Sequence, residues 1–100
     1  MITRVWHGRT SLEHVDSYLN FLLTKGTADY KKVAGNLSVR VWRRLDTDCA
    51  HFCTVTEWDN IESIRKFAGE HYEKAVYYPE DQGILLEFEE HVAHYESFVV

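Results

Sequence analysis

The segment 55–69 constrains the fold of this chain more than any other part of the sequence. An apolar, β-rich run ends there at Trp58, and the pattern Asp59-x-x-Glu62, typical of a helix N-terminus, follows directly. The helix is then marked by apolar residues at helical spacing: Ile61, Ile64 and Phe67. Trp58 therefore lies at a strand–helix corner, where a large flat side chain can form the wall of a pocket.

Apolar periodicity in the first half predicts a strand and a helix. Residues 2–9 alternate as a strand, and Thr10-x-x-Glu13 then opens a helix whose apolar residues repeat at helical spacing. Gly26 is a natural end for that helix. A connector follows, with one helical turn possible around Tyr30.

The second half predicts a hairpin and a broken helix. Strands 37–45 and 49–58 flank the turn signal Asp46-Thr-Asp48. Gly69 weakens the helix after Trp58, so we expect a second helical piece over 70–78. A loop at 79–83, an extended run at 84–88 and a last strand at 90–99 should follow. The order β-α-β-β-α-β predicts an α+β, ferredoxin-like split β-α-β fold with a four-stranded antiparallel sheet, ordered 4-1-3-2.

The strands carry bulky side chains on both faces. Neighbours such as Val5 and Trp6, or Val41 and Trp42, point to opposite sides of a sheet. Two helices cover only one face, and an open second face should be polar. We therefore expect the second face to be buried against another copy, in a two-fold homodimer formed through the sheet.

Composition limits the class of protein. One hundred residues, 45% of them hydrophobic and one a proline, predict a single domain over residues 1–100. The net charge of −5 and the scattered Lys and Arg argue against nucleic-acid binding. The N-terminus has no apolar signal core and no apolar run approaches a membrane span, so we expect no membrane partner and a cytoplasmic location.

Cys49 and Cys53 lie four residues apart in a strand-like run. At roughly 3.3 Å per residue their Cα atoms would be about 13 Å apart, which is too far for a disulfide. The simplest prediction is two reduced thiols.

Segments along nearly the whole chain carry a family resemblance. They include Trp58 to Gly69, the spacing Tyr18…Gly26…Tyr30, Arg4-Val-Trp-His-Gly8, Gly35-Asn36, Ala75-Val-Tyr-Tyr-Pro-Glu-Asp81 and Val92-Ala-His-Tyr-Glu96. In these segments the chain resembles the antibiotic biosynthesis monooxygenase (ABM)-like domains of the dimeric α+β barrel superfamily, and within them an uncharacterised bacterial subgroup. The resemblance implies a barrel-like homodimer.

The resemblance also implies two activities. Quinone-forming members oxidise polycyclic phenols with O₂ and need neither metal nor flavin. They use a corner tryptophan, matched here by Trp58, with an asparagine and a tyrosine whose positions hold Thr54 and Ile64. Haem-degrading members use an asparagine, a tryptophan and an iron-ligating histidine, whose positions fall here near His7, at Phe67, and near Val76 or Tyr77. We therefore expect no cofactor and no metal site.

His7 and His94 are the candidate catalytic residues. Strands one and four are neighbours in the expected sheet, so the two histidines could share a face, one abstracting a phenolic proton while the other orients it. Alternatively, each histidine bonds to a neighbouring backbone or carboxylate group. No trio of His, Cys, Asp or Glu has the spacing of a metal site.

Five aromatic residues are candidates for substrate binding: Trp58, Trp6, Phe67, Tyr72 and Tyr78. They would line a cavity between helices and sheet, the usual site for a flat apolar ligand. The alternative is that they pack as ordinary core. Breaks at Gly69 and Pro79 suggest that the segment between them acts as a flap.

Three hypotheses follow. The leading one is a cofactor-independent monooxygenase-like enzyme that acts on a flat aromatic or quinone-type small molecule. A second is a non-catalytic homodimer that binds a small ligand or has a structural role. A third is a haem-binding protein that uses His71 or His7.

Overall fold

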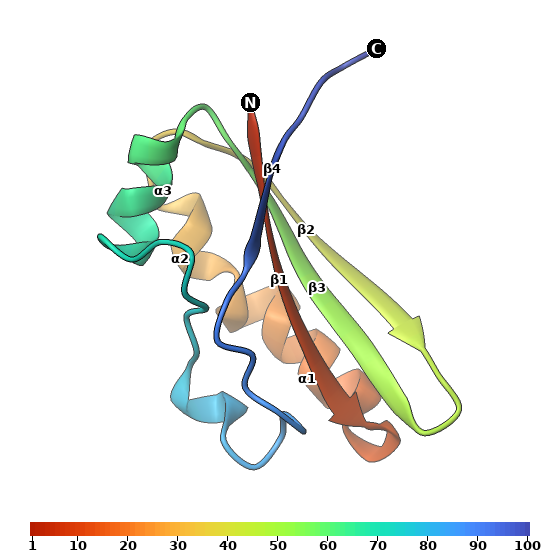
Figure 1. Ribbon diagram of the computed structural model, residues 1–100. Coiled ribbons are helices and arrows are strands. Elements are labelled where there is room, and N and C mark those ends of the chain that lie inside the picture. Colours follow the sequence, from red (N-terminus) through yellow and green to blue (C-terminus); the bar gives the residue numbers. More distant parts are fainter.

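The computed structural model describes residues 1–100 and contains a curved antiparallel sheet with helices packed on one face (Figure 1). The sheet is built from four strands: β1 (Ile2–Ser11), β2 (Asn36–Leu45), β3 (Cys49–Trp58) and β4 (Ala93–Glu96). Their order is β2-β3-β1-β4, which is the expected 4-1-3-2 read from the other edge. The predicted α+β, ferredoxin-like fold is confirmed.

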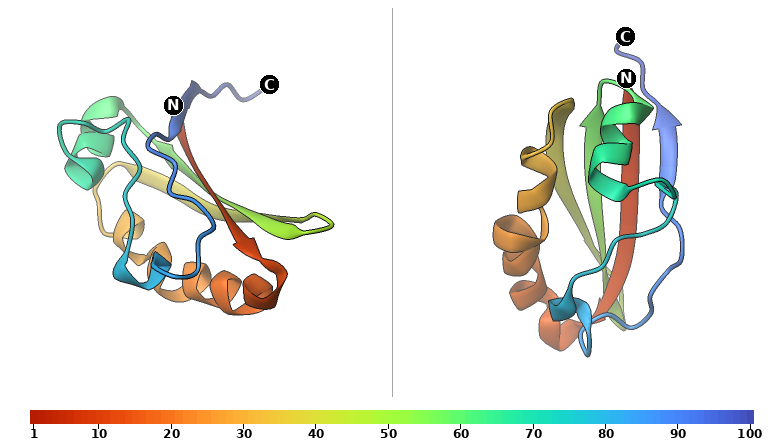
Figure 2. Two further views of the ribbon diagram at one scale, coloured as in Figure 1. Left: turned by 60° about the horizontal axis from the view of Figure 1, so that its bottom comes forward. Right: turned by 90° about the vertical axis from the view of Figure 1, so that its left-hand side faces the viewer.

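The helices all lie on the same side of the sheet, as the two views of Figure 2 show. The first helical region is irregular and consists of a 3₁₀ turn, two short α-helices and a π turn between them: η1 (Leu12–His14), α1 (Val15–Phe21), η2 (Leu22–Gly26) and α2 (Ala28–Lys31). The second is a regular helix, α3 (Ile61–Ala68). None of these helices has the length and apolar character that crossing a bilayer requires.

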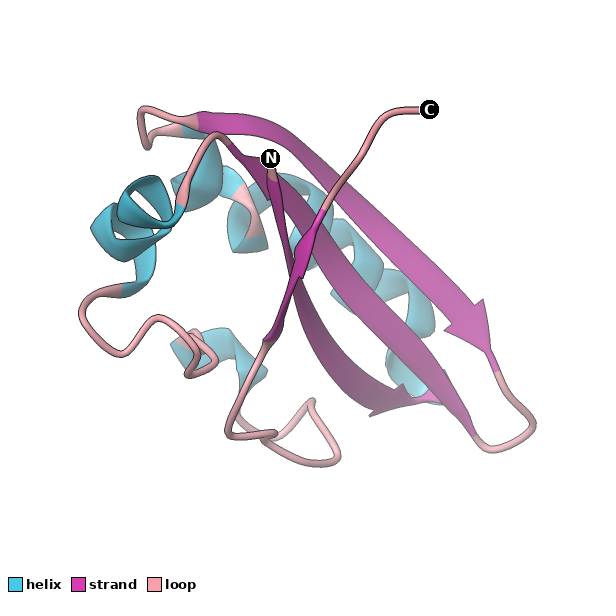
Figure 3. Cartoon of the chain, turned by 45° about the horizontal axis from the view of Figure 1, so that its top comes forward, coloured by secondary structure: helices cyan, strands magenta, loops and turns pink.

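Alternation along β1 and β3 separates a helix-covered face from an open face. Arg4, Trp6 and Thr10 of β1 are buried on the covered face, and their partners across the ladder are Thr56, Thr54 and Ala50. The intervening positions point away from the helices, because successive side chains of a strand alternate. Figure 3 shows the strands with α1 behind them.

The core divides into two clusters under the helices. The larger one contains Trp6, Tyr18, Leu22, Ala50, Phe52 and Leu85. The smaller one contains Tyr30, Trp58 and Ile64. The strand–helix corner therefore forms one cluster with α2 and α3, and the opposite end of the sheet forms the other.

The strand–helix corner forms where the sequence predicts it. β3 ends at Trp58, whose ring is fully buried and whose Nε1 donates to Thr56 Oγ1 at 2.8 Å. The capping residue of α3 is Asn60, whose side chain accepts from the Ser63 amide at 3.0 Å, whereas Asp59 was the expected cap. Asp59 instead donates its amide proton to the Gly35 carbonyl at 3.0 Å, which ties the corner to the start of β2.

Several predicted boundaries in the first half are corrected. β1 continues through Ser11. Of the two expected N-cap residues, Thr10 and Ser11, Ser11 takes the position before the first turn, but the capping box does not form, because Ser11 makes no side-chain cap bond and the Thr10 hydroxyl donates to the Ser11 carbonyl. The expected helical turn around Tyr30 is present as α2. Cys49 and Cys53 are free thiols, as predicted.

The chain after α3 differs most from expectation. Gly69 leaves the helix at φ +87°, and the expected helical piece over 70–78 and extended strand over 84–88 are both absent. Residues 69–92 instead form turns, isolated bridges and the 3₁₀ turn η3 (Pro79–Asp81). The physical reason is non-local pairing: the amides of Ala75 and Val92 donate to carbonyls across the segment at 2.9 Å each. The last strand shortens to β4 accordingly.

The open face is mixed rather than apolar. Charged and polar side chains such as His7, Arg9 and Arg44 share it with Trp42 and Tyr95, which are 55% and 57% exposed. An exposed tryptophan and tyrosine on one sheet face are compatible with contact to another molecule.

Gly35 provides a test of how the corner is held. A Cβ at Gly35, where φ is +96°, would meet the Ser63 hydroxyl and approach Asp59 Oδ1 to 2.6 Å. Gly69 has a similar φ of +87° with nothing within 4 Å, so it is a matched control. In urea unfolding, Gly69→Ala should lower the free energy of unfolding by about 1–2 kcal/mol through backbone strain. Gly35→Ala should lower it by about 1–3 kcal/mol more, through overpacking. Equal losses in both variants would contradict this account.

Candidate functional site

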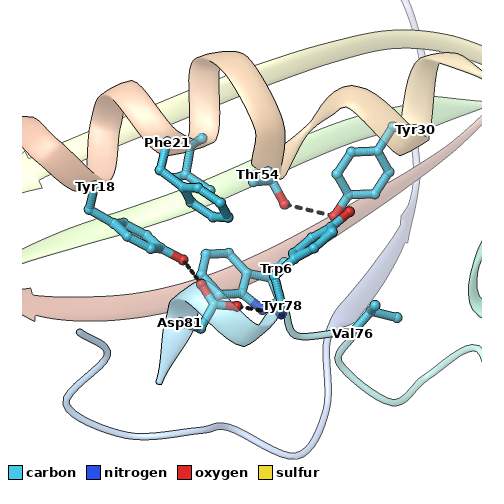
Figure 4. Close-up of a pocket in the computed structure, with 10 residues that line it drawn as sticks. Trp6, Tyr18, Phe21, Tyr30, Thr54, Val76, Tyr78 and Asp81 are labelled. Atoms are coloured by element: carbon cyan, nitrogen blue, oxygen red, sulfur yellow. Dashed lines mark hydrogen bonds between the residues drawn. The ribbon is translucent and has the colours of Figure 1, made fainter. Parts of the chain in front are cut away.

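A small aromatic cavity lies between the sheet and the first helical region, under the segment that carries η3 (Figure 4). Five aromatic side chains contribute most of its wall: Trp6, Tyr18, Phe21, Tyr30 and Tyr78. It holds only about 10 Å³ of space, which is roughly the room of one water molecule. The cavity is therefore too small for a larger ligand unless its cover moves.

The polar groups of the cavity converge on Asp81. The Tyr18 hydroxyl donates to Asp81 Oδ1 at 2.8 Å, and the Tyr78 amide donates to Asp81 Oδ2 at 2.7 Å (Figure 4). Burial raises the pKa of Tyr18, and its bond to the Asp81 carboxylate raises that pKa further. The cavity thus holds a neutral phenol against a carboxylate that is only 2% exposed.

Residues 69–92 form the cover of the cavity, and polar side-chain contacts hold it to the helices. Besides the Tyr18–Asp81 bond, the Tyr78 hydroxyl donates to Asp29 Oδ2 at 2.9 Å, and Lys25 forms an ion pair with Glu80. Burial and the bond to Asp29 both raise the pKa of Tyr78. The cover contains no regular strand or α-helix, and near its far end the Leu86 amide donates to the Arg9 carbonyl of β1 at 2.9 Å. The part around Tyr78 and Glu80 is therefore held to the helices by side chains, whereas residues 85 and 86 are bonded to the sheet.

Arg4 is the most unusual residue of the covered face. It lies two residues before Trp6 on β1, is 1% exposed, and makes one hydrogen bond, from Nη2 to the Lys74 carbonyl at 3.2 Å. Its Nε and Nη1 are buried without a partner, and no carboxylate pairs with it. Burial lowers the pKa of Arg4, and the nearby Tyr30 phenol opposes that effect. A buried cation without a counter-ion is costly, because its desolvation is not compensated.

His94 lies directly beside this cation. It faces Arg4 across the β1–β4 ladder, and the edge of the Tyr72 ring packs against it with centroids 5.3 Å apart. His94 Nε2 is buried and has no partner. Burial lowers the pKa of His94, Arg4 lowers it further, and Glu73 opposes them, so the imidazole is neutral at neutral pH.

The structure divides the predicted substrate-binding residues into three groups. Trp6 and Tyr78 line the cavity. Phe67 and Tyr72 pack against Arg4 and His94: the Arg4 guanidinium is 5.3 Å from the centre of the Phe67 ring, and the Tyr72 and His94 ring centroids are 5.3 Å apart. Trp58 is core between Tyr30 and Phe67 and does not line the cavity.

The predicted pairing of His7 with His94 is wrong. His94 is opposite Arg4, on the covered face, whereas His7 is three residues further along β1 and therefore points to the open face. His7 instead contacts Glu89 through Nδ1 and lies 2.9 Å from His51 Nδ1 through Nε2. The two candidate catalytic histidines are thus separated by the sheet.

The sequence alone does not single out Arg4 or Asp81. A signal for Arg4 exists: it shares the parity of Trp6, so whichever face buries the tryptophan also buries the arginine. Asp81 carries no comparable signal, because the fold of the cover brings it to Tyr18.

Comparison with known proteins places the fold. The chain matches no protein-family model and no curated protein. Among solved structures it is similar to MhuD, in a point mutant with two manganese protoporphyrin IX molecules bound per active site. The TM-score is 0.62 over 100% of this chain and 97% of that one, with 11% sequence identity. The two proteins share an α+β, ferredoxin-like fold. At this identity the likeness concerns the fold alone.

Arg4 should reduce the stability of the protein. Replacing a buried, uncompensated charge by an apolar side chain of similar length is often stabilising by about 1–4 kcal/mol. We expect Arg4→Met to raise the free energy of unfolding in urea by an amount in that range. Arg9→Met is the control, because Arg9 lies on the open face of the same strand and is paired with Glu87. A clear loss of stability in Arg4→Met but not in Arg9→Met would show that the Arg4 guanidinium stabilises the folded state instead of destabilising it.

Proposed function

We propose that this chain binds a flat, acidic aromatic molecule between sheet and helices and acts on it as an ABM-type, cofactor-independent monooxygenase. The observation that carries the proposal is the buried Arg4 guanidinium, with two unpartnered nitrogens beside an aromatic cavity. The ABM-like fold supports the same class of ligand site.

Arg4 sets the charge of the ligand. A guanidinium offers planar, paired N–H donors that match a carboxylate or a phenolate. Within this chain those donors have no acceptor, so an anionic ligand supplies the missing partner. The Tyr30 phenol lies beside Arg4 and also lines the cavity, which connects the charged position to the aromatic one.

The cavity sets the shape of the ligand. Aromatic rings on the sheet, on the helices and on the cover favour a flat, apolar body held between them. Because the closed cavity has room for about one water, binding is coupled to displacement of the cover through its contacts at Tyr18 and Tyr78. The displaced cover would then close over the ligand and exclude solvent.

His94 supplies the base. As a neutral imidazole with a free Nε2, it accepts the acidic proton of a bound phenol or of its ketone tautomer, and Arg4 stabilises the anion that forms. Where this anion places charge on a ring carbon, that carbon adds O₂. The hydroperoxide then loses water, so that a ring CH₂ becomes a carbonyl: one oxygen atom enters the product and the other leaves as water. No further reductant is needed.

Haem is the second candidate ligand. Protoporphyrin is flat, aromatic and carries two carboxylates, and the structure of MhuD holds manganese protoporphyrin IX in its active site. His94, on the covered face, is half-buried and its Nε2 is a buried nitrogen without a partner. The two histidines first considered for iron fit less well, because His71 is exposed and His7 points to the open face with both ring nitrogens engaged.

Ligand binding and turnover are tested with two probes, a hydroxyanthrone and hemin. We expect hydroxyanthrone to quench tryptophan fluorescence and to drive O₂ uptake at an oxygen electrode. Removing one charge-assisted partner costs about 1.5–3 kcal/mol, so Arg4→Met should weaken binding roughly 10–100-fold. His94→Gln should retain binding and lose O₂ uptake, and Arg9→Met should behave as the unmodified protein.

The outcomes separate the hypotheses. Binding without O₂ uptake would identify a non-catalytic binding protein. A hemin Soret shift that disappears in His94→Gln would favour haem. If neither probe binds, or if Arg4→Met binds both as well as the unmodified protein, the proposal fails.

We also propose that two copies pair through the open sheet face. Trp42 on β2 and Tyr95 on β4 are exposed at the two edges of that face, with the buried Val55 between them on β3. Sedimentation equilibrium should give twice the subunit mass of 11.8 kDa. Trp42→Arg should shift the mass to that of one subunit. Leu23→Arg, which changes an equally exposed residue in the helical layer, should leave the dimer intact. A single-subunit mass for the unmodified protein would rule the dimer out.

A further inference from the structure

A cluster of ligand-type side chains lies on the open face, away from the aromatic cavity. Asp46 is in the β2–β3 turn, and Cys49 and His51 are two residues apart on β3, so their side chains share a face. A carboxylate oxygen, the thiol sulfur and an imidazole nitrogen of these residues all lie within 4.8 Å of one another.

Hydrogen bonds link the neighbouring histidine to this cluster. The Glu89 carboxylate only accepts, so His7 Nδ1 donates to it. His7 Nε2 lies 2.9 Å from His51 Nδ1, so one of these two nitrogens donates to the other. When His51 Nδ1 is the donor, the lone pair of His51 is on Nε2, which faces Asp46 and Cys49.

This arrangement brings acceptors together. His51 Nε2 lies 2.9 Å from Asp46 Oδ2 and 3.6 Å from Cys49 Sγ. The other carboxylate oxygen of Asp46 accepts from Arg44, which leaves Oδ2 for this contact. Two kinds of cation fit between His51 Nε2 and this carboxylate: a proton on the ring or a metal ion that both groups bind.

Two further features favour a metal ion. Arg9 Nη1 donates to Cys49 Sγ at 3.9 Å, which orients the sulfur beside His51 Nε2. A depression of about 490 Å³ opens over the cluster, bordered by Arg9 and Leu86, and leaves room for a water ligand.

We propose that Asp46, Cys49 and His51 bind one Zn²⁺ ion, with water in the fourth position. One nitrogen, one sulfur and one oxygen ligand are the donor types that zinc takes in proteins. Ligand atoms about 2.0–2.3 Å from a tetrahedral ion are roughly 3.3–3.8 Å apart, so only small side-chain rotations are needed here. His7 and Glu89 are positioning residues, because they hold the His51 ring in the tautomer that offers Nε2 to the metal.

Cobalt and zinc binding to the chelator-treated full chain test the site. We expect one Co²⁺ per chain, with the absorption of a tetrahedral ion and a thiolate charge-transfer band, and displacement of Co²⁺ by Zn²⁺. Cys49→Ser should abolish the charge-transfer band. Cys53→Ser is the matched control and should keep it, because Cys53 is the other thiol of the same strand and face. His7→Gln should weaken Zn²⁺ binding about 10–100-fold while the band persists.

A measurement on the unmodified protein tests the site without depending on whether the variants fold. Zn²⁺ should slow the alkylation of Cys49 and leave the alkylation rate of Cys53 unchanged, as mapped by mass spectrometry. Equal protection of both thiols, or a charge-transfer band that survives in Cys49→Ser, would overturn the site. Absence of metal binding, together with a doubly protonated His51 ring in ¹⁵N NMR spectra, would show that the cation is a proton. None of these outcomes depends on ligand binding at Arg4, which is on the other face of the sheet.

Discussion

The antiparallel pairing of β1 with β3 is the constraint on which the rest of the structure depends. Ten residues of each strand pair in unbroken register, from Ile2 opposite Trp58 to Ser11 opposite Cys49. Because side chains alternate across a strand, this one ladder builds two environments. The covered face receives Arg4 and Trp6, and the open face receives the polar side chains between and beyond them. A shift of one residue in this pairing would move every side chain of a strand to the other face. The core and both proposed sites therefore depend on the same register.

The covered face combines a well-packed aromatic core with one charge that the core does not need. Trp58 and its neighbours bury large apolar areas, whereas Arg4 is buried with two nitrogens unpartnered. Such a charge is tolerated when the remaining core is stable enough to offset its desolvation. Arg4 and His94 place a cation and an imidazole among these aromatic side chains.

Local signals predicted those parts of the fold that local interactions determine. The hairpin of β2 and β3 and the corner at Trp58 follow from strict alternation and from a capping sequence, each contained within a few residues. The cover was not predicted, because its conformation depends on distant partners: Asp81 on Tyr18 and Tyr78 on Asp29. An aromatic, weakly helical sequence such as 70–78 loses its helix when non-local pairing satisfies its backbone instead.

The sequence by itself determined the fold class and the order of the four sheet strands and of the helices that cover them, because apolar periodicity is a local property of the chain. Only the tertiary structure decided which chemistry-bearing residues meet. The register of β4 against β1 puts His94 opposite Arg4, and it leaves His7 on the far side with His51. No local pattern encodes that register, since it depends on how the chain closes over many intervening residues. The histidines that seemed a pair in sequence therefore belong to two different faces.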